Sequence, residues 1–158
     1  MINPGDAIDA IVAALQAIPE LTSAIGGPQN ILAYHPTFPT KMYFRQDLDA
    51  LEPGQILVRY LGTAPGTLRE NLVWKHDFGI YQNPPNTSAA EQSSDHYLFL
   101  MGLINGIPAT GDGNKMLNLA VVDGCEIMDV PTVSIYTDLT LKRDYFFVKF
   151  TFPEIGDN

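Results

Sequence analysis

The segment from Leu72 to Gln82 constrains the fold most, because its side chains alternate along its whole length. Residues that point to one side are mainly apolar: Leu72, Trp74, His76, Phe78 and Ile80. The residues between them are mostly polar or charged, which is typical of a β-strand with one face on a core. The sequence therefore predicts a strand here, with Trp74 and His76 as core residues.

Other segments predict further strands around this one. Gln55–Leu61 alternates little, which favours a strand buried on both faces. Ile31–His35 predicts a short strand, which the prolines that follow end or confine to a sheet edge. Arg143–Phe152 is dense in aromatic residues and predicts the closing strand. Residues 117–137 add strand-like sequence interrupted by turn residues.

Two segments carry helical patterns. The first runs from Asp6 to Ile18, with apolar residues at helical spacing, Asp6 as its N-cap and Pro19 as its stop. The second runs over Ser88–Asn105, where Ser88 and Glu91 form a capping box. The chain is thus predicted to be α+β, a single domain over 1–158 with a mainly antiparallel β-sheet and two principal α-helices packed on one face.

The residues that could carry out catalysis are not arranged for it. His76 and Asp77 are neighbours on a strand and point to opposite faces, so they cannot pair. Asp95 and His96 are neighbours on the second helix and do not face each other. No Gly-x-Ser-x-Gly turn is present to expose a nucleophilic serine. The sequence predicts that the chain is not an enzyme.

Metal and cofactor patterns are also incomplete. His35, His76 and His96 lack the spacing of zinc ligands. Residues 112–114 begin like a calcium loop, but Leu117 stands where that loop needs glycine. The glycine-rich segments are not followed by the Lys-Ser/Thr pair of a phosphate-binding loop. We expect neither a metal nor a cofactor.

Charge limits the partners of the chain. It has 18 acidic and 9 basic residues, a net charge of −9, and no Lys or Arg before Lys41. Tight nucleic-acid binding needs clustered basic residues, so we do not expect it. Charged residues make up only 17%, against about 25% in average proteins. Such sparse charge suggests that other chains cover part of the surface.

Loops and sheet edges are the expected contact regions. The segments 62–70 and 109–115 are glycine-rich, lie between strong elements and are predicted to be loops that contact neighbouring proteins. Strand edges flanked by prolines invite pairing between subunits. Residues 97–104 form the longest apolar stretch, too short to span a membrane. Together these features favour an assembly component.

The order of these motifs resembles a known family. The features that carry the resemblance are the first helix ending in Ile18-Pro19-Glu20-Leu21, then Ala33-Tyr34-His35, the strand over 54–61, Leu72–Tyr81, the second helix and the aromatic strand over 143–152. In this layout the chain is similar to the tail-terminator (tail-completion) neck proteins of long-tailed bacteriophages. Residues 36–54 read as an insertion relative to that family.

The resemblance implies a structural role in a virion assembled in the host cytoplasm. Six copies would form a ring that caps the tail tube, ends its polymerisation and joins the tail to the head connector. Its partners would be further copies of itself, the tail tube protein and the head-connector or stopper protein. DNA would pass through the ring without specific binding. The family has no catalytic residues to transfer, no cofactor and no membrane association.

A DNA channel favours acidic or neutral walls, since a basic wall would trap phosphates. The candidate channel-facing residues lie in or beside predicted turns: Asp112, Asp123, Glu126 and Asp129. The alternative is that these acids only keep the outer surface hydrated. A different class of function also stays open, namely a small α+β ligand-binding or enzymatic domain whose site is built from scattered residues.

Overall fold

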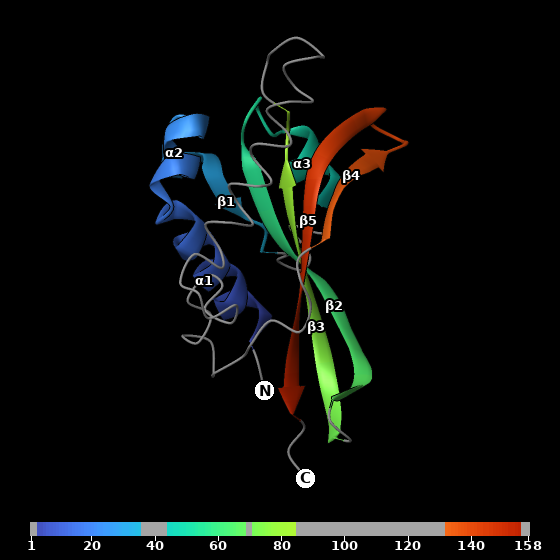
Figure 1. Cartoon of the computed structure of the whole chain (residues 1–158). Coiled ribbons are helices and arrows are strands. Elements are labelled where there is room, and N and C mark those ends of the chain that lie inside the picture. Colours follow the sequence, from blue (N-terminus) through green and yellow to red (C-terminus); the bar gives the residue numbers. More distant parts are fainter. Residues whose placement is uncertain (1–2, 36–43, 69–70, 85–131, 156–158) are drawn as a thin grey trace.

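The computed structural model describes residues 3–35, 44–68, 71–84 and 132–155 (Figure 1). Its elements are α1 (Pro4–Gln16), α2 (Pro19–Ile25), a 3-10 turn (Pro28–Asn30), β1 (Ile31–Ala33), α3 (Phe44–Asp49), β2 (Ile56–Leu68), β3 (Asn71–Gln82), β4 (Thr132–Asp138) and β5 (Arg143–Ile155). The predicted α+β class is confirmed. The predicted helix over 88–105 lies outside the described residues.

The described strands form one sheet in the order β1-β2-β3-β5-β4. β2, β3, β5 and β4 pair antiparallel, as expected for a mainly antiparallel sheet. β1 pairs parallel with β2, which the sequence pattern did not indicate. Among the described strands, β1 lies at one edge, which is one of the two outcomes predicted for the 31–35 strand, and β4 lies at the other edge. In Figure 1, α1 and α2 lie on the β1 side of the sheet and β4 lies on the other side.

The start and end of α1 differ from the prediction. The side chain of Asn3, not Asp6, caps the helix, because its Oδ1 accepts hydrogen bonds from the backbone N–H groups of Gly5 and Asp6. α1 ends at Gln16, before the predicted stop at Pro19, and Pro19 also begins α2. A proline suits the first position of a helix, where its missing N–H would have no partner in any case.

One core lies between α1 and the sheet. Ile8, Ile11 and Leu15 on α1 are fully buried and belong to the same cluster as Ile56 and Val58 of β2. The remaining strand residues of this cluster are Ile31, Phe78, Ile80 and Val148. The apolar stripe read from the sequence is therefore the face of α1 that covers the sheet.

A second core lies on the opposite face of the sheet, beneath α3. Leu48 of α3 is buried there with Leu57, Tyr81 and Tyr145. Because Ile56 belongs to the first core and its neighbour Leu57 to the second, β2 is buried on both faces at this end. This confirms the prediction drawn from its lack of alternation.

The predicted loop at 62–70 was wrong over most of its length, because β2 continues to Leu68. The strand register shifts between Tyr60 and Gly62, which marks a β-bulge. Gly62 has a φ of 129°, a backbone conformation open to glycine but strained for other residues. Gly62 therefore marks a bulge within the long hairpin of β2 and β3, and not the start of a loop. The predicted loop at 109–115 lies outside the described residues.

The prediction that both Trp74 and His76 are core residues was only half right. His76 is 4% exposed, and its Nδ1 lies 3.0 Å from the hydroxyl of Tyr60. Trp74 shares this face of β3 but is 43% exposed. β1 pairs only with Ile56–Val58 of β2, so the hairpin of β2 and β3 runs on past it (Figure 1). An alternating pattern shows which residues share a face, but not how far that face is covered.

Two alanine substitutions on this face of β3 test how far the core extends. Phe78→Ala should lower the free energy of unfolding by about 3–5 kcal/mol, because it empties a fully buried site. Trp74→Ala serves as the matched control and should cost about 1 kcal/mol or less, since much of the ring is already in water. Urea denaturation followed by circular dichroism measures both, and equal losses would contradict the assigned core.

Candidate functional site

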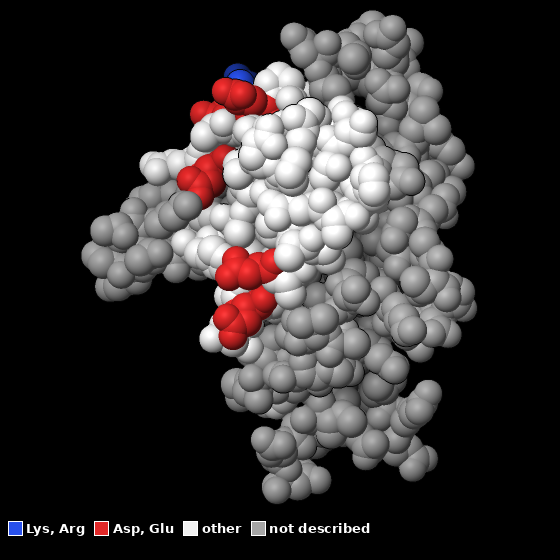
Figure 2. Space-filling model, turned by 90° about the vertical axis from the view of Figure 1, so that its left-hand side faces the viewer, with Lys and Arg blue, Asp and Glu red and all other residues white. Residues whose placement is uncertain are grey.

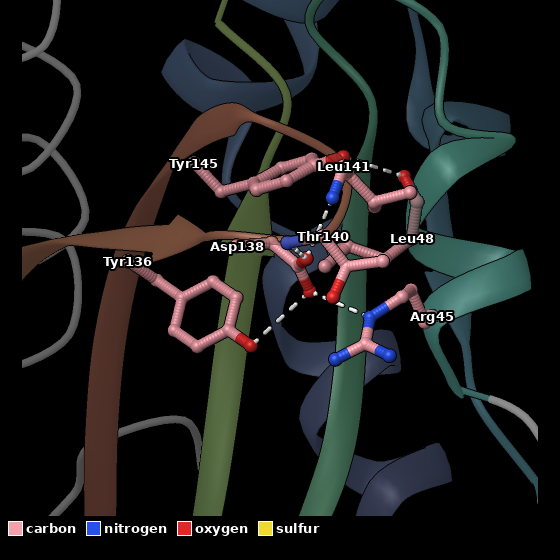
Figure 3. A network of polar contacts seen from close by, with 7 residues as sticks. All are labelled: Arg45, Leu48, Tyr136, Asp138, Thr140, Leu141 and Tyr145. Atoms are coloured by element: carbon pink, nitrogen blue, oxygen red, sulfur yellow. Dashed lines mark hydrogen bonds and ion pairs between the residues drawn. The ribbon is translucent and has the colours of Figure 1, made fainter.

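Asp138, at the end of β4, is the centre of a polar network that closes the β4–β5 hairpin (Figure 3). Its Oδ1 accepts hydrogen bonds from the backbone N–H groups of Thr140 and Leu141, both at 2.9 Å. Its Oδ2 accepts from Arg45 Nε of α3 at 3.1 Å and from the Tyr136 hydroxyl at 3.5 Å. One carboxylate therefore shapes the turn and also ties it to α3.

The surroundings of Asp138 favour its ionised form. The backbone N–H of Leu141 lowers the pKa of this carboxyl most, and the hydrogen bond and charge of Arg45 lower it further. Burial opposes this effect, because the side chain is only 2% exposed. The hydrogen bonds and the cation outweigh the loss of hydration, so Asp138 is a carboxylate at neutral pH.

Two more contacts hold α3 against the hairpin. The hydroxyl of Tyr145 donates a hydrogen bond to the backbone carbonyl of Leu48 at 3.2 Å (Figure 3). Arg143 Nη1 lies 3.3 Å from Oδ1 of Asp49. Both contacts join α3 to the start of β5. A helix as short as α3 is not stable alone, and these contacts supply what its own hydrogen bonds cannot.

Aromatic rings fill the space beneath α3. The ring of Phe44 lies 5.2 Å from that of Tyr34 and 5.0 Å from that of Tyr81, measured between centroids. The guanidinium carbon of Arg59 lies 3.9 Å from the Phe44 ring centroid, a cation–π contact. Burial raises the pKa of Tyr81 to about 12, although Arg59 acts in the opposite direction. These aromatic rings pack against one another beneath α3. The hydroxyl of Tyr81 stays protonated at neutral pH.

β4 lies at an edge of the sheet that the described strands form. Among the described strands its one neighbour is β5, and its sequence, Thr-Val-Ser-Ile-Tyr-Thr-Asp, contains no proline, glycine or lysine. Such residues usually protect an edge from pairing with other chains. Ile135 in the middle of β4 is 56% exposed. β1, at the other edge, has only three residues, so β4 is the edge better suited to contact another chain.

The predicted channel residues Asp112, Asp123, Glu126 and Asp129 lie outside the described residues. Figure 2 shows carboxylates along one side of the described surface on the α1 side of the molecule, and Lys or Arg at its upper rim. Asp6 and Asp9 are exposed there, and Oδ1 of Asp9 lies 2.7 Å from Nε2 of His35. Within the described ranges, no group of three or more His, Cys, Asp or Glu residues could hold a metal ion.

Sequence reasoning missed the Asp138 network. Arg45 and Asp138 are 93 residues apart, and no local pattern pairs them. One signal was the aspartate itself, because an aspartate side chain often starts a turn by accepting backbone N–H groups a few residues on. The partner on α3 becomes evident only when the sheet brings the two segments together.

Replacing Asp138 tests the network through its pH dependence. The folded-state pKa of Asp138 lies below its ordinary value of 3.8, so its contribution to stability is present above pH 3.8 and is lost as the pH falls through the folded-state value. Asp138→Asn should therefore lower the melting temperature at pH 7, and the difference from the unchanged chain should shrink in stronger acid.

The matched control for this substitution is Asp144→Asn, which changes an exposed carboxylate on the same hairpin that contacts Thr137. It should shift the melting temperature much less. Thermal melts between pH 2 and 7 measure both variants. Equal shifts, or a deficit of Asp138→Asn that stays constant down to pH 2, would contradict the role given to Asp138.

No family model and no curated protein matches this chain. No helix among the described residues is both long and apolar enough to cross a membrane. The edge position of β4 and the network that supports it are therefore the features from which a function is inferred.

Proposed function

We propose that this chain is a structural subunit of a bacteriophage neck ring, which caps the tail tube, ends its polymerisation and joins the tail to the head connector. The observation that carries the proposal is the position of β4 at an edge of the described sheet, with its exposed Ile135. An unprotected edge with an exposed apolar side chain suits association with other chains. The layout of motifs in the sequence supplies the tail-terminator assignment and the sixfold order.

The two ends of the sheet differ, and this supports a ring rather than a closed pair. β4 is long and unprotected, whereas β1 is short and lies beside α1. When two different surfaces of identical copies meet, the contact repeats from copy to copy and closes into a ring if the rotation permits.

Charge supports a ring through which DNA passes without being held. The net charge is −9, and the carboxylates of Asp6 and Asp9 on α1 are exposed. Repulsion between carboxylates and phosphates prevents tight binding of a duplex. The virion location and the partners (tail tube protein and head-connector or stopper protein) belong to the same proposal.

Blocking the β4 edge tests the proposal. The purified chain should sediment as a ring-sized species and give ring-shaped particles in negative-stain electron microscopy. Ile135→Lys should raise the dissociation constant of the assembly about tenfold, because a charge in a strand–strand contact is costly. Ala64→Lys is the matched control, since it adds the same charge at an exposed strand position away from β4.

Two outcomes would contradict the neck-ring proposal. A single-chain mass under all conditions would favour the alternative of a small ligand-binding or enzymatic domain. Heads and tails that join normally without any copy of this chain would exclude the neck role even if the chain forms rings.

DNA binding gives an independent test. Purified protein should show no affinity for duplex DNA in a fluorescence anisotropy titration at about 0.15 M salt, because it cannot displace counterions from phosphates. Micromolar or tighter binding that weakens steeply with added salt would reveal a basic surface. That result would contradict a channel that lets DNA slide.

A further inference from the structure

The turn between β4 and β5, which we call the Leu139 turn (residues 139–142), exposes a large apolar side chain. Leu139 is 84% exposed, more than any other large hydrophobic residue among the described ones. An isolated exposed leucine needs no explanation in most proteins. This one stands at the tip of a hairpin whose neighbouring strand β4 also exposes Ile135.

The Leu139 turn is held in one conformation. Asp138 accepts hydrogen bonds from the N–H groups of Thr140 and Leu141, and it is bound to Arg45 of α3 (Figure 3). Leu141 packs against the core beneath α3. The chain therefore presents Leu139 on a fixed support, and binding through it costs little loss of conformational freedom.

Positive charge lies beside this leucine. Lys142, in the same turn, is exposed, and Arg143 follows it at the start of β5. They are the only adjacent basic pair in a chain with 9 basic and 18 acidic residues. Arg143 is partly neutralised by Asp49, which leaves the charge of Lys142 for an outside partner. The tip thus combines an apolar side chain with positive charge, and it fits an acidic surface.

The face over α1 and α2 offers the complementary chemistry. Its described exposed carboxylates are those of Asp6 and Asp9, of which Asp9 also contacts His35, and no Lys or Arg occurs before Lys41. Farther along the two helices Ala13, Ala17 and Ala24 are exposed, together with the polar residues Gln16 and Ser23. Figure 2 shows carboxylates along one side of a largely uncharged area on this side of the molecule. A leucine can pack on such an area while a neighbouring lysine meets the carboxylates.

The two surfaces lie on opposite sides of the subunit. α1 packs against β1 and β2, at one edge of the sheet, and the Leu139 turn extends from β4 at the other edge. Figure 1 shows α1 and α2 on the left and the β4–β5 hairpin on the right. Surfaces placed in this way cannot meet within one copy, but they can meet between successive copies of a ring.

We propose that the Leu139 turn of one copy docks on the acidic α1–α2 face of the next copy. Leu139 packs over the exposed alanines, and Lys142 faces the carboxylates of Asp6 and Asp9. This inference rests on the proposed ring, and it adds which surfaces form the contact between copies. Electrostatic attraction guides the approach and fixes which surface is chosen, while the leucine supplies the buried area.

Substitution of the leucine tests the apolar part of the contact. Leu139→Ser should raise the dissociation constant of the assembly about tenfold or more, because a buried leucine becomes a polar side chain. Trp74→Ser is the matched control, since it removes an exposed apolar side chain from a different part of the sheet and should leave assembly unchanged. Sedimentation velocity of the full chain measures both, and thermal melts check folding.

Charge reversal tests the pairing of the two surfaces. Lys142→Glu alone and the double variant Asp6→Lys/Asp9→Lys alone should each weaken assembly, and the loss should be smaller at high salt. Combining all three substitutions should restore assembly at least in part, because opposite charges face each other again. If the separate variants failed to assemble because they were misfolded, combining their substitutions would not restore assembly.

The outcomes separate this inference from the proposed ring. If the unchanged chain assembles but Leu139→Ser assembles equally well, the docking contact is wrong and the ring proposal stands. If the triple variant loses as much assembly as the Lys142→Glu and Asp6→Lys/Asp9→Lys variants lose together, the two surfaces do not face each other. If the unchanged chain stays monomeric at all concentrations, both the ring and this contact are excluded.

Discussion

The burial of β2 on both faces is the constraint on which the rest of the described structure depends. Ile56 and Val58 face α1, whereas Leu57 between them faces the aromatic layer. A strand of this kind needs cover on each side, because either face left in water would expose apolar surface worth several kcal/mol. The helix α1 is long enough to supply one cover by its apolar stripe. The other cover, α3, is too short to do so alone.

The polar contacts of α3 follow from that shortness. A helix of six residues gains little from its own hydrogen bonds, so its position depends on what it touches. Asp138 and Tyr145 reach it from the β4–β5 hairpin, and Phe44 anchors it in the aromatic layer. The same carboxylate that holds α3 also shapes the Leu139 turn. The position of α3 and the conformation of the Leu139 turn therefore both depend on Asp138.

The alternation of side chains along a strand predicted the strands and their buried faces. Contacts between distant segments did not follow from the sequence. Alternation located β3, and its absence in 55–61 correctly indicated two-sided burial, because both depend only on which residues neighbour each other. Trp74 was misplaced because alternation carries no information on where a covering layer ends. Gly62 was taken for a break because the same backbone freedom serves both a loop and a bulge. The Arg45–Asp138 pair depends on the folded sheet, and the candidate channel residues lie outside the described part of the chain.

The strand order also has a consequence for the timing of folding. β4 precedes β5 in the chain, yet β5 lies between β4 and β3 in the sheet. During synthesis β4 thus emerges before the strand that attaches it to the sheet has been made. The hairpin of β4 and β5 can close through contacts between nearby residues. Its attachment to the sheet needs β5 to pair with β3, which is a slower, non-local step. The Leu139 turn can therefore take its shape early, whereas its connection to α3 through Arg45 forms only when the distant segments meet.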